Sequence, residues 1–363
     1  MFKLHKIFIL SLFIALFSCA KDNDFEQPPT ARTVLVYMAA DNNLYQNAIK
    51  DIEEMEKAIL PANVHLLIYL DAANENFPQI FEIKNGSRVS VKQYEPQNSV
   101  SGKVLQQIIT DVVSAFPAQS YGLVLWSHGT GWLPAGWYED ITQQEIQRSF
   151  GKEKTYEMEI AELANSLPLK FDFILFDACL MSNIETLYQL RKKADIIIAS
   201  PTEILVAGFP YTEVAPLLFS ENYAQIAQAY MNYYKSQTGI LQSASIAIIN
   251  TQELENLSAI LKNSNVTFPT DKSTIQKYDT RANTVYYDLQ DYLEHSANDN
   301  IAAIKQQIAR TIIYRDYTPY FLNDLPLEKS CGISIFVFPY ENDFLENQYK
   351  MLDWYRDTEL LCR

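Results

Sequence analysis

Residues 171–182 read Phe-Asp-Phe-Ile-Leu-Phe-Asp-Ala-Cys-Leu-Met-Ser, and this stretch decides the fold. Its first half is a continuous run of apolar and aromatic residues, the composition of a strand buried on both faces of a parallel sheet. The run stops at Asp177-Ala178-Cys179, and a helical segment over residues 183–193 follows almost at once. Open α/β sheets place their active sites at the carboxyl ends of such strands. We therefore expect Cys179 to lie at a functional site.

A second stretch, roughly 50 residues upstream, has the same design. Residues 121–127 read Tyr-Gly-Leu-Val-Leu-Trp-Ser and lead into His128-Gly129-Thr130-Gly131. We expect one helix between the two strands, over residues 156–167, and a right-handed crossover then makes the strands neighbours or near-neighbours. A thiolate nucleophile needs a base beside it, so the pattern predicts Cys179 as nucleophile and His128 as its base. The backbone N–H groups of Gly129 and Cys179 are the candidate oxyanion hole.

The alternative for Cys179 is a small buried hydrophobe, the usual role of a lone cysteine. The matching histidine favours the catalytic interpretation. The other histidines do not compete: His5 lies in a targeting segment, and we expect structural roles for His65, inside a strand, and His295, at a polar helix end.

The rest of the chain supplies the elements of a doubly wound sheet. Buried strands are predicted at residues 33–38, 64–70 and 195–200, helices at 42–60 and 101–116, and a hairpin at Asn85-Gly86-Ser87. This alternation predicts an α/β fold with a mostly parallel central sheet and helices on both faces. We place the sheet core at about residues 33–250. A C-terminal extension of helices and a late strand (332–338) occupies about residues 251–363.

The amino-acid composition indicates a globular protein that does not bind nucleic acid. The chain has 363 residues, 48% of them hydrophobic, and a formal net charge of −15. A globular, monomeric protein is expected. Such acidity argues against binding nucleic acid, whose phosphates would be repelled.

Residues 1–18 form a targeting segment, because Lys3 and Lys6 precede a hydrophobic run that is short for a membrane span. The run ends in Leu16-Phe17-Ser18-Cys19, which resembles a bacterial lipobox. The resemblance implies cleavage before Cys19, lipidation of its sulfur and a flexible tether over residues 19–32. The alternative is an ordinary signal peptide with an incidental cysteine. The acidic run after Cys19 resembles surface-export signals of Bacteroidetes lipoproteins, which implies a Gram-negative outer membrane and exposure on the cell surface.

Residues 133–155 form a long polar stretch between the two site strands. Connections of this length in compact domains are usually functional or mobile. A solvated charged loop is the equally weighted alternative.

The two strand ends, Ser127-His128-Gly129-Thr130-Gly131-Trp132 and Asp177-Ala178-Cys179-Leu180-Met181-Ser182, resemble the signatures of the clostripain family of cysteine peptidases. The opening segment 34–44 and the late segment 331–336 match this family too, so the resemblance runs from about residue 33 to residue 339. It implies a caspase-like fold shared with gingipains and legumain. It also implies peptide-bond hydrolysis by a Cys179–His128 dyad without an obligatory third member.

The resemblance further implies cleavage after Arg or Lys and self-cleavage between the two site strands. Asp177 matches the acidic residue of the family's primary specificity pocket, although it also suits a helix cap. Segment 200–211 departs from the family pattern, which has further acidic residues at this point. Glu203 is the residue in this segment that could supply the negative charge. Arg148, Lys152 and Lys154 are the candidate self-cleavage points.

No cofactor is required by this chemistry. Some relatives depend on calcium, so calcium remains possible, but the acidic loops lack EF-hand spacing and no metal site is assigned. Two alternatives stay open: a surface binding lipoprotein of the same fold without turnover, and a peptidase with a primary pocket for small or apolar residues.

Overall fold

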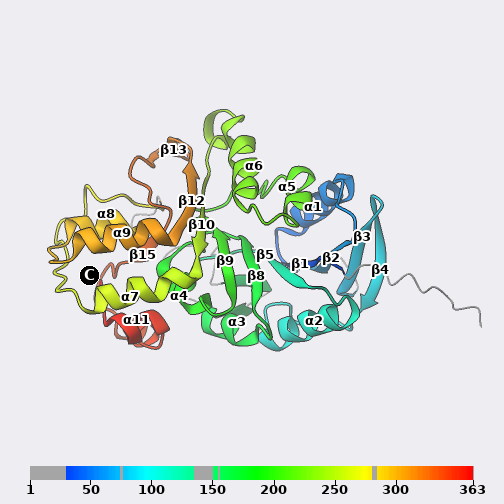
Figure 1. Ribbon diagram of the computed structural model, residues 1–363, viewed down its shortest axis with the longest axis horizontal. Helices are drawn as coiled ribbons and strands as arrows, with labels where there is room; N and C mark the ends of the chain where they lie inside the picture. Colours follow the sequence, from blue (N-terminus) through cyan, green and yellow to red (C-terminus); the bar gives the residue numbers. More distant parts are fainter. Residues whose placement is uncertain (1–29, 74–76, 135–149, 154–155, 280–283, 363) are drawn as a thin grey trace, which may run out of the picture.

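The computed structural model describes residues 30–73, 77–134, 150–153, 156–279 and 284–362. Its centre is a nine-stranded sheet in the order β12-β10-β9-β8-β5-β1-β2-β3-β4 (Figure 1). Strands β9, β8, β5, β1 and β2 run parallel, and antiparallel strands continue the sheet on both sides. The sheet strands are β1 Arg32–Ala40, β2 Val64–Ala72, β3 Gln79–Lys84, β4 Ser87–Gln93, β5 Ser120–Trp126, β8 Phe171–Asp177, β9 Ala194–Ala199, β10 Ser245–Asn250 and β12 Ile312–Tyr317.

Helices cover both faces of the sheet, as the sequence predicts (Figure 1). Strand β1 shows why: Val34 and Val36 pack with one helical layer, and Leu35 and Tyr37 with the other, so every residue of the strand is buried. The first layer is formed by α1 Tyr45–Lys57, α5 Tyr211–Leu217 and α6 Ala224–Lys235, and the second by α2 Gly102–Ala115, α3 Ile160–Ser166 and α4 Ile184–Leu190.

The predicted hairpin forms β3 and β4. Asn85 and Gly86 both adopt positive φ angles (51° and 74°), as a tight two-residue hairpin turn requires. All residues of β4 are exposed, and β4 is the last strand of the sheet within the described ranges. Arg88 pairs with Glu56 of α1, and Lys92 pairs with Asp111 of α2.

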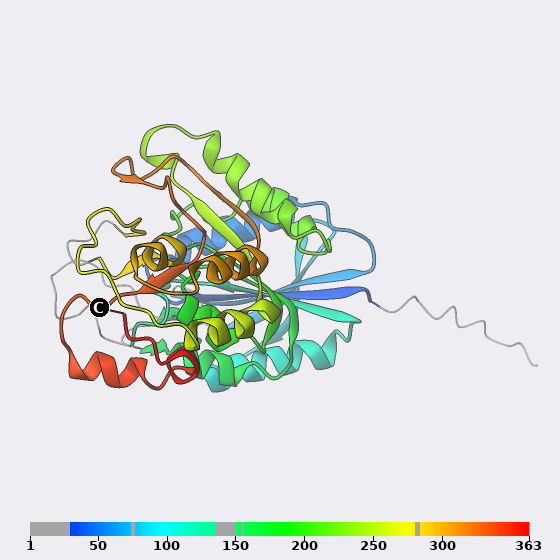
Figure 2. The ribbon, with the colours of Figure 1, turned by 60° about the vertical axis from the view of Figure 1, so that its left-hand side comes forward.

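The C-terminal extension packs against one end of the sheet, beside α4 (Figure 2). It also contributes to the sheet, because β12 pairs with β10. The sheet therefore continues beyond the expected boundary near residue 250. The late strand is shorter than expected and pairs with β11 in a separate ladder. The extension contains α7 Leu254–Lys262, β11 Tyr286–Asp288, α8 Leu289–His295, α9 Ile301–Thr311, β13 Tyr320–Phe321, β14 Leu325–Pro326, β15 Ser334–Phe336, α10 Asp343–Tyr349 and α11 Asp353–Thr358.

Two local predictions are wrong. The helix expected from residue 156 begins at Ile160, because Tyr156–Met158 forms strand β7, which pairs with β6 Phe150–Glu153. The helix expected over residues 42–60 ends at Lys57, and Ile59 lies beyond it with 89% of its surface exposed. The helical spacing of apolar residues extends to Ile59, but the helix itself does not.

Candidate active site

The two predicted site strands are neighbours. Strands β5 and β8 pair in parallel, with Trp126 opposite Asp177, so both chains leave the sheet at the same edge. His128 and Cys179 follow directly, and both line one cavity of about 160 Å³. The other lining residues are Asn43, Leu44, Trp126, Ser127, Asp177, Ala178, Ile204, Leu205, Val206 and Gly208. The structure thus brings together the residues that the sequence predicted as nucleophile and base.

Cys179 precedes a sharp backbone turn. Leu180 has φ +63°, a left-handed conformation that side chains other than glycine rarely adopt. Two hydrogen bonds hold it: its N–H donates to the Thr202 carbonyl at 2.9 Å, and its carbonyl accepts from the Asn183 side-chain amide at 2.8 Å. The turn ends the strand at Asp177 and places the Cys179 side chain at the sheet edge. No sequence signal marked Leu180 for this role.

The Cys179 thiol is largely buried, with 8% of the residue exposed. The Ile204 N–H donates to its Sγ at 3.2 Å, and Sγ lies 3.6 Å from the Ile204 carbonyl oxygen. A backbone N–H that points at sulfur stabilises the thiolate more than the neutral thiol, because the charged acceptor makes the stronger hydrogen bond.

His128 is held by the loop before α1. Its Nε2 lies 2.8 Å from Asn43 Oδ1. An amide oxygen only accepts hydrogen bonds, so Nε2 carries the proton and Nδ1 is the basic nitrogen of the neutral ring. Burial, and then the charge of Lys152, lower the pKa of His128 to about 4. The imidazole is therefore neutral at pH 7, the state that accepts a proton.

The glycines after His128 allow close packing. A Cβ on Gly129 would lie 2.6 Å from the Cys179 carbonyl oxygen, so the loop lies directly against the turn that carries the cysteine. A Cβ on Gly131 would lie 2.3 Å from Asn183 Nδ2 and 2.5 Å from the Tyr286 hydroxyl. Tyr286, in the extension, donates a hydrogen bond to the Thr130 carbonyl at 2.6 Å.

Asp177 lines the cavity and does not cap helix α4, whose N-cap is Asn183. Its Oδ2 accepts hydrogen bonds from the Tyr211 hydroxyl at 3.0 Å and from the Phe209 N–H at 3.4 Å. Burial raises the pKa of Asp177 in spite of these bonds. Asp51 of α1 lies beside it, and the negative charge of Asp177 adds to burial in raising the pKa of Asp51.

The remaining predicted site residues lie elsewhere. Glu203 is half-buried next to the cavity but is not one of its lining residues. Lys152 lies in β6, where its carbonyl accepts from the Asn42 side chain at 2.8 Å. Cys19, Arg148 and Lys154 fall outside the described residues. Cys331 and Cys362, which are not candidate site residues, are buried and are not joined by a disulfide.

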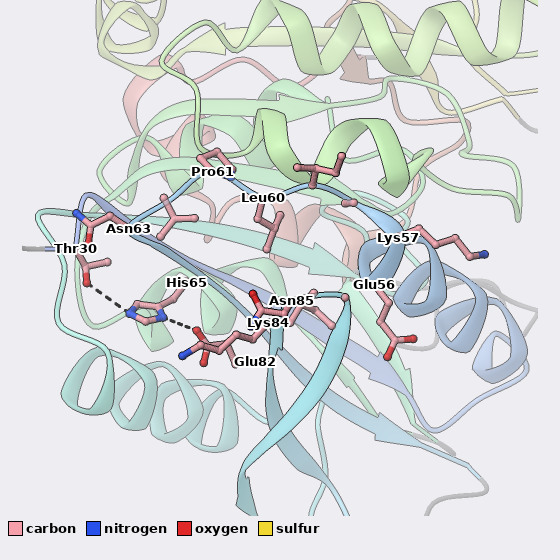
Figure 3. A pocket seen from close by; sticks show the side chains of 15 residues that line it. Thr30, Glu56, Lys57, Leu60, Pro61, Asn63, His65, Glu82, Lys84 and Asn85 are labelled. Atoms are coloured by element: carbon pink, nitrogen blue, oxygen red, sulfur yellow. Dashed lines mark hydrogen bonds and ion pairs between the residues drawn. The ribbon is translucent and has the colours of Figure 1, made fainter.

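A larger cavity, of about 660 Å³, lies at the opposite end of the parallel strands (Figure 3). His65, near the start of β2, points into it between Thr30 and Glu82 (Figure 3). Its Nδ1 lies 2.6 Å from Glu82 Oε1. His295 likewise has local partners in Asp291 and Thr274. Neither histidine lines the cavity that contains Cys179.

Within the described ranges, no group of three or more His, Cys, Asp or Glu side chains is arranged to hold a metal ion. None of the helices in these ranges is both long enough and apolar enough to cross a membrane.

A caspase-like α/β sheet that carries a cysteine and a histidine at the ends of adjacent strands is typical of cysteine peptidases. The profile of the Clostripain family matches residues 36–355, and the chain belongs to this family. Clostripain of Hathewaya histolytica is 26% identical over 221 residues, which are 50% of this chain and 41% of that protein. The chain thus matches less than half the length of this relative.

Solved structures of the same family share the whole fold. An inactive zymogen C11 protease from Parabacteroides distasonis is 36% identical, with a TM-score of 0.78 over 92% of this chain and 99% of that one. A secreted C11 cysteine protease from Bacteroides thetaiotaomicron, solved with an irreversible peptide inhibitor, is 30% identical. Its TM-score is 0.78 over 91% of this chain and 99% of that one.

Proposed function

We propose that this chain hydrolyses peptide bonds with Cys179 as nucleophile and His128 as general acid and base. The shared cavity at the ends of β5 and β8 is the observation that carries the proposal. A secreted relative from Bacteroides thetaiotaomicron was solved with an irreversible peptide inhibitor, which supports a peptide substrate here.

The steps of the proposed reaction follow from a neutral His128 imidazole beside the Cys179 thiol. His128 Nδ1 takes the thiol proton, and the Cys179 thiolate attacks the carbonyl carbon of the scissile bond. The backbone N–H groups of Gly129 and Cys179 hold the resulting oxyanion. The imidazolium then gives its proton to the leaving amine, and a thioester remains. His128 next takes a proton from water, the hydroxide attacks the thioester, and the sulfur leaves as thiolate. Asn43 holds the ring in the tautomer that these steps need.

We propose a preference for Arg or Lys before the scissile bond. Asp177 supports it, because a buried carboxylate at the wall of the cavity makes a strong charge-assisted contact with a cationic side chain. Glu203 lies beside the cavity without lining it, and an acidic contribution from it stays a prediction.

Self-cleavage in the connection between β5 and β8 is also proposed. Lys152 supports it, because its charge acts on His128 and it therefore lies near the site.

Lipidation of Cys19 and attachment to the outer membrane rest on the sequence pattern. Metabolic labelling with a fatty-acid analogue tests them, with label expected on the full chain and lost in Cys19→Ser.

The deciding experiment uses protein that starts after Cys19. Fluorogenic peptides with Arg, Lys, Asp, Ala or Leu before the scissile bond are incubated with wild type and Cys179→Ala, with and without calcium. Cleavage after Arg or Lys by wild type only is expected, together with a wild-type-only shift on a denaturing gel. Cleavage after apolar residues alone would refute the basic preference. No cleavage of any peptide would favour a binding protein of this fold.

A further inference from the structure

Asp51 is a buried carboxylate that the reaction described above does not use. It lies in α1, on the face that packs against the sheet with Ala48, Ile52 and Met55, and only 4% of it is exposed. A carboxylate in such a position needs a partner or a function, since burying a charge costs several kcal/mol when it is not compensated.

The geometry at Gly208 locates both carboxylates. This glycine lines the cavity that contains Cys179 and has φ +59°. A Cβ built on it would lie 3.0 Å from Asp177 Oδ2, 3.4 Å from Asp177 Oδ1 and 3.5 Å from Asp51 Oδ2. Both carboxyl groups therefore lie directly against this glycine of the cavity wall, although Asp51 is not itself a lining residue.

The hydrogen-bond donors around the pair carry no charge, and burial together with the charge of Asp177 favours the protonated form of Asp51. Asp51 Oδ2 accepts from the Trp126 indole N–H at 2.8 Å, and Asp177 accepts from Tyr211 and Phe209. All three donors are neutral groups. Nearby, the buried Tyr230 hydroxyl has no hydrogen-bond partner among the described residues. Burial, and after it the charges of Tyr234, Asp177 and Cys179, raises the pKa of Tyr230. Neither Asp51 nor Asp177 thus accepts a hydrogen bond from a cationic side chain among the described residues.

We propose that Asp51 is a second specificity-determining residue of the primary pocket and binds, together with Asp177, the cationic side chain that precedes the scissile bond. This inference rests on the proposed function. A guanidinium or ammonium group bound at the cavity wall beside Gly208 would lie close to carboxyl oxygens from α1 and from the end of β8. Two carboxylates on one cation are a stronger contact than the single Asp177 that the sequence indicated.

The competing role for Asp51 is structural, as the acceptor that holds Trp126 next to His128. Two variants separate the roles. Asp51→Asn keeps a side chain of the same size with an oxygen that accepts from the indole, but it removes the charge. Trp126→Phe removes the indole donor and keeps both carboxylates. Glu53→Gln is the matched control, because it removes one charge from the exposed side of the same helix.

Each protein is assayed with two peptides that differ only in Arg or its uncharged isostere citrulline before the scissile bond. For Asp51→Asn we expect kcat/KM on the Arg peptide to fall about tenfold or more, with the citrulline peptide changed less than about twofold. Trp126→Phe and Glu53→Gln should keep the wild-type ratio. Melting temperatures measured alongside identify any variant that is not folded, and Asp51→Glu, which keeps the charge, should retain most of the preference if Asp51→Asn fails to fold.

The outcomes separate the two proposals. An unchanged ratio in Asp51→Asn, or equal losses on both peptides, overturns the role of Asp51 while the wild-type cleavage still supports the peptidase. Loss of the ratio in Trp126→Phe as well shows that Asp51 acts only through the indole. Wild-type protein that cleaves neither peptide overturns the proposed function, and this inference falls with it.

Discussion

Leu180 and Gly131 both have positive φ angles, and they lie in the loops that follow the two site strands. Asn183 connects them, because its side-chain amide donates to the Leu180 carbonyl and lies where a Cβ on Gly131 would be. Its side-chain oxygen also caps α4 by accepting from the Thr186 N–H. One asparagine thus stabilises the turn after Cys179, caps a helix and packs against the loop after His128.

We expect Gly131→Ala to destabilise the protein by about 2 kcal/mol or more, because the new methyl group adds a collision with Asn183 to a strained φ. Gly239→Ala is the matched control. Gly239 has φ +59° but nothing within 4 Å of its Cβ position, so it should cost only about 1 kcal/mol. Urea unfolding of both variants measures the difference. Equal losses would show that the contact with Asn183 is unimportant.

The pKa of His128 gives a prediction on pH. Because burial and Lys152 lower it to about 4, kcat/KM should fall on the acid side only near pH 4. Removing the charge in Lys152→Gln should move this limb to higher pH, whereas Lys152→Arg should leave it in place. Titration of His128 by NMR in a Cys179→Ala background checks the shift without self-cleavage. A limb that stays fixed in Lys152→Gln would contradict the assignment.

The lowered pKa of His128 also makes the folding stability of the protein depend on pH. The unfolded chain binds a proton on this histidine at about pH 6.5, whereas the folded protein does so only near pH 4. His128 therefore favours the fold fully above pH 6.5, and this contribution is lost as the pH falls through that interval.

At the scale of elements, α1 shows which features of a helix the sequence predicts and which depend on the rest of the fold. The sequence predicted a helix here, and the structure buries Ile52 and Met55 on its inner face. Asp51 lies on the same buried face. Its special environment could not be predicted from the helix alone, because the neighbouring carboxyl group, Asp177, comes from β8, far away in the sequence. Strand pairing also explains why β7 replaces the first turn of an expected helix: residues 156–158 pair with β6, which lies only a few residues upstream.

The closeness of Cys179 and His128, the candidate catalytic pair, was predictable because both residues follow apolar strands and have glycine or small residues next to them. The Leu180 turn and the Asn43 contact were not, since each depends on backbone hydrogen bonds or loop positions that no local pattern encodes.

Arg32 joins elements at the start of the sheet. This buried side chain of β1 forms an ion pair with Asp172 of β8 at 2.8 Å and donates to the carbonyls of Leu218 and Ser220. We expect Arg32→Met to cost about 2 kcal/mol, because these acceptors lose their donor. Lys170→Met removes an exposed pair with Asp195 and should cost less than about 1 kcal/mol. Chemical denaturation compares the two, and similar losses would contradict the prediction.

At the scale of the whole molecule, the extension is attached to the candidate active site. The Ser334 N–H donates to the Ser182 carbonyl at 2.9 Å, and the Ser182 hydroxyl donates to the Gly332 carbonyl at 2.7 Å. Together with the bond from Tyr286 to Thr130, these contacts hold both site loops from outside the parallel strands. The extension is therefore part of the catalytic unit.

Glu185 of α4 also connects the sheet core to the C-terminal extension, through a buried carboxyl group. It accepts from the Phe336 N–H at 3.0 Å and from the Tyr349 hydroxyl at 3.1 Å, and burial raises its pKa to about 7. The folded state favours the protonated acid, so its stabilising contribution is complete below about pH 4.5 and is lost as the pH rises through 7.

We therefore expect Glu185→Gln to be more stable than wild type at pH 8.5 by up to about 3 kcal/mol, with little difference at pH 4.5. Urea midpoints at the two pH values, in a Cys179→Ala background, measure this. The exposed Glu213→Gln controls for the loss of one surface charge. A variant that is less stable at both pH values would show that the charged form is the one the fold prefers.

Strand β4 has a consequence for how copies of this protein behave at high concentration. Among the described residues, no strand pairs with its outer edge, and Val89 and Val91 are 45% and 37% exposed between Arg88 and Lys92. Such an edge is a template for β-pairing between molecules, and charged side chains on an edge strand are a common means of opposing it. Replacing Arg88 and Lys92 would therefore be expected to lower solubility more than folding stability, because both side chains form only exposed surface pairs.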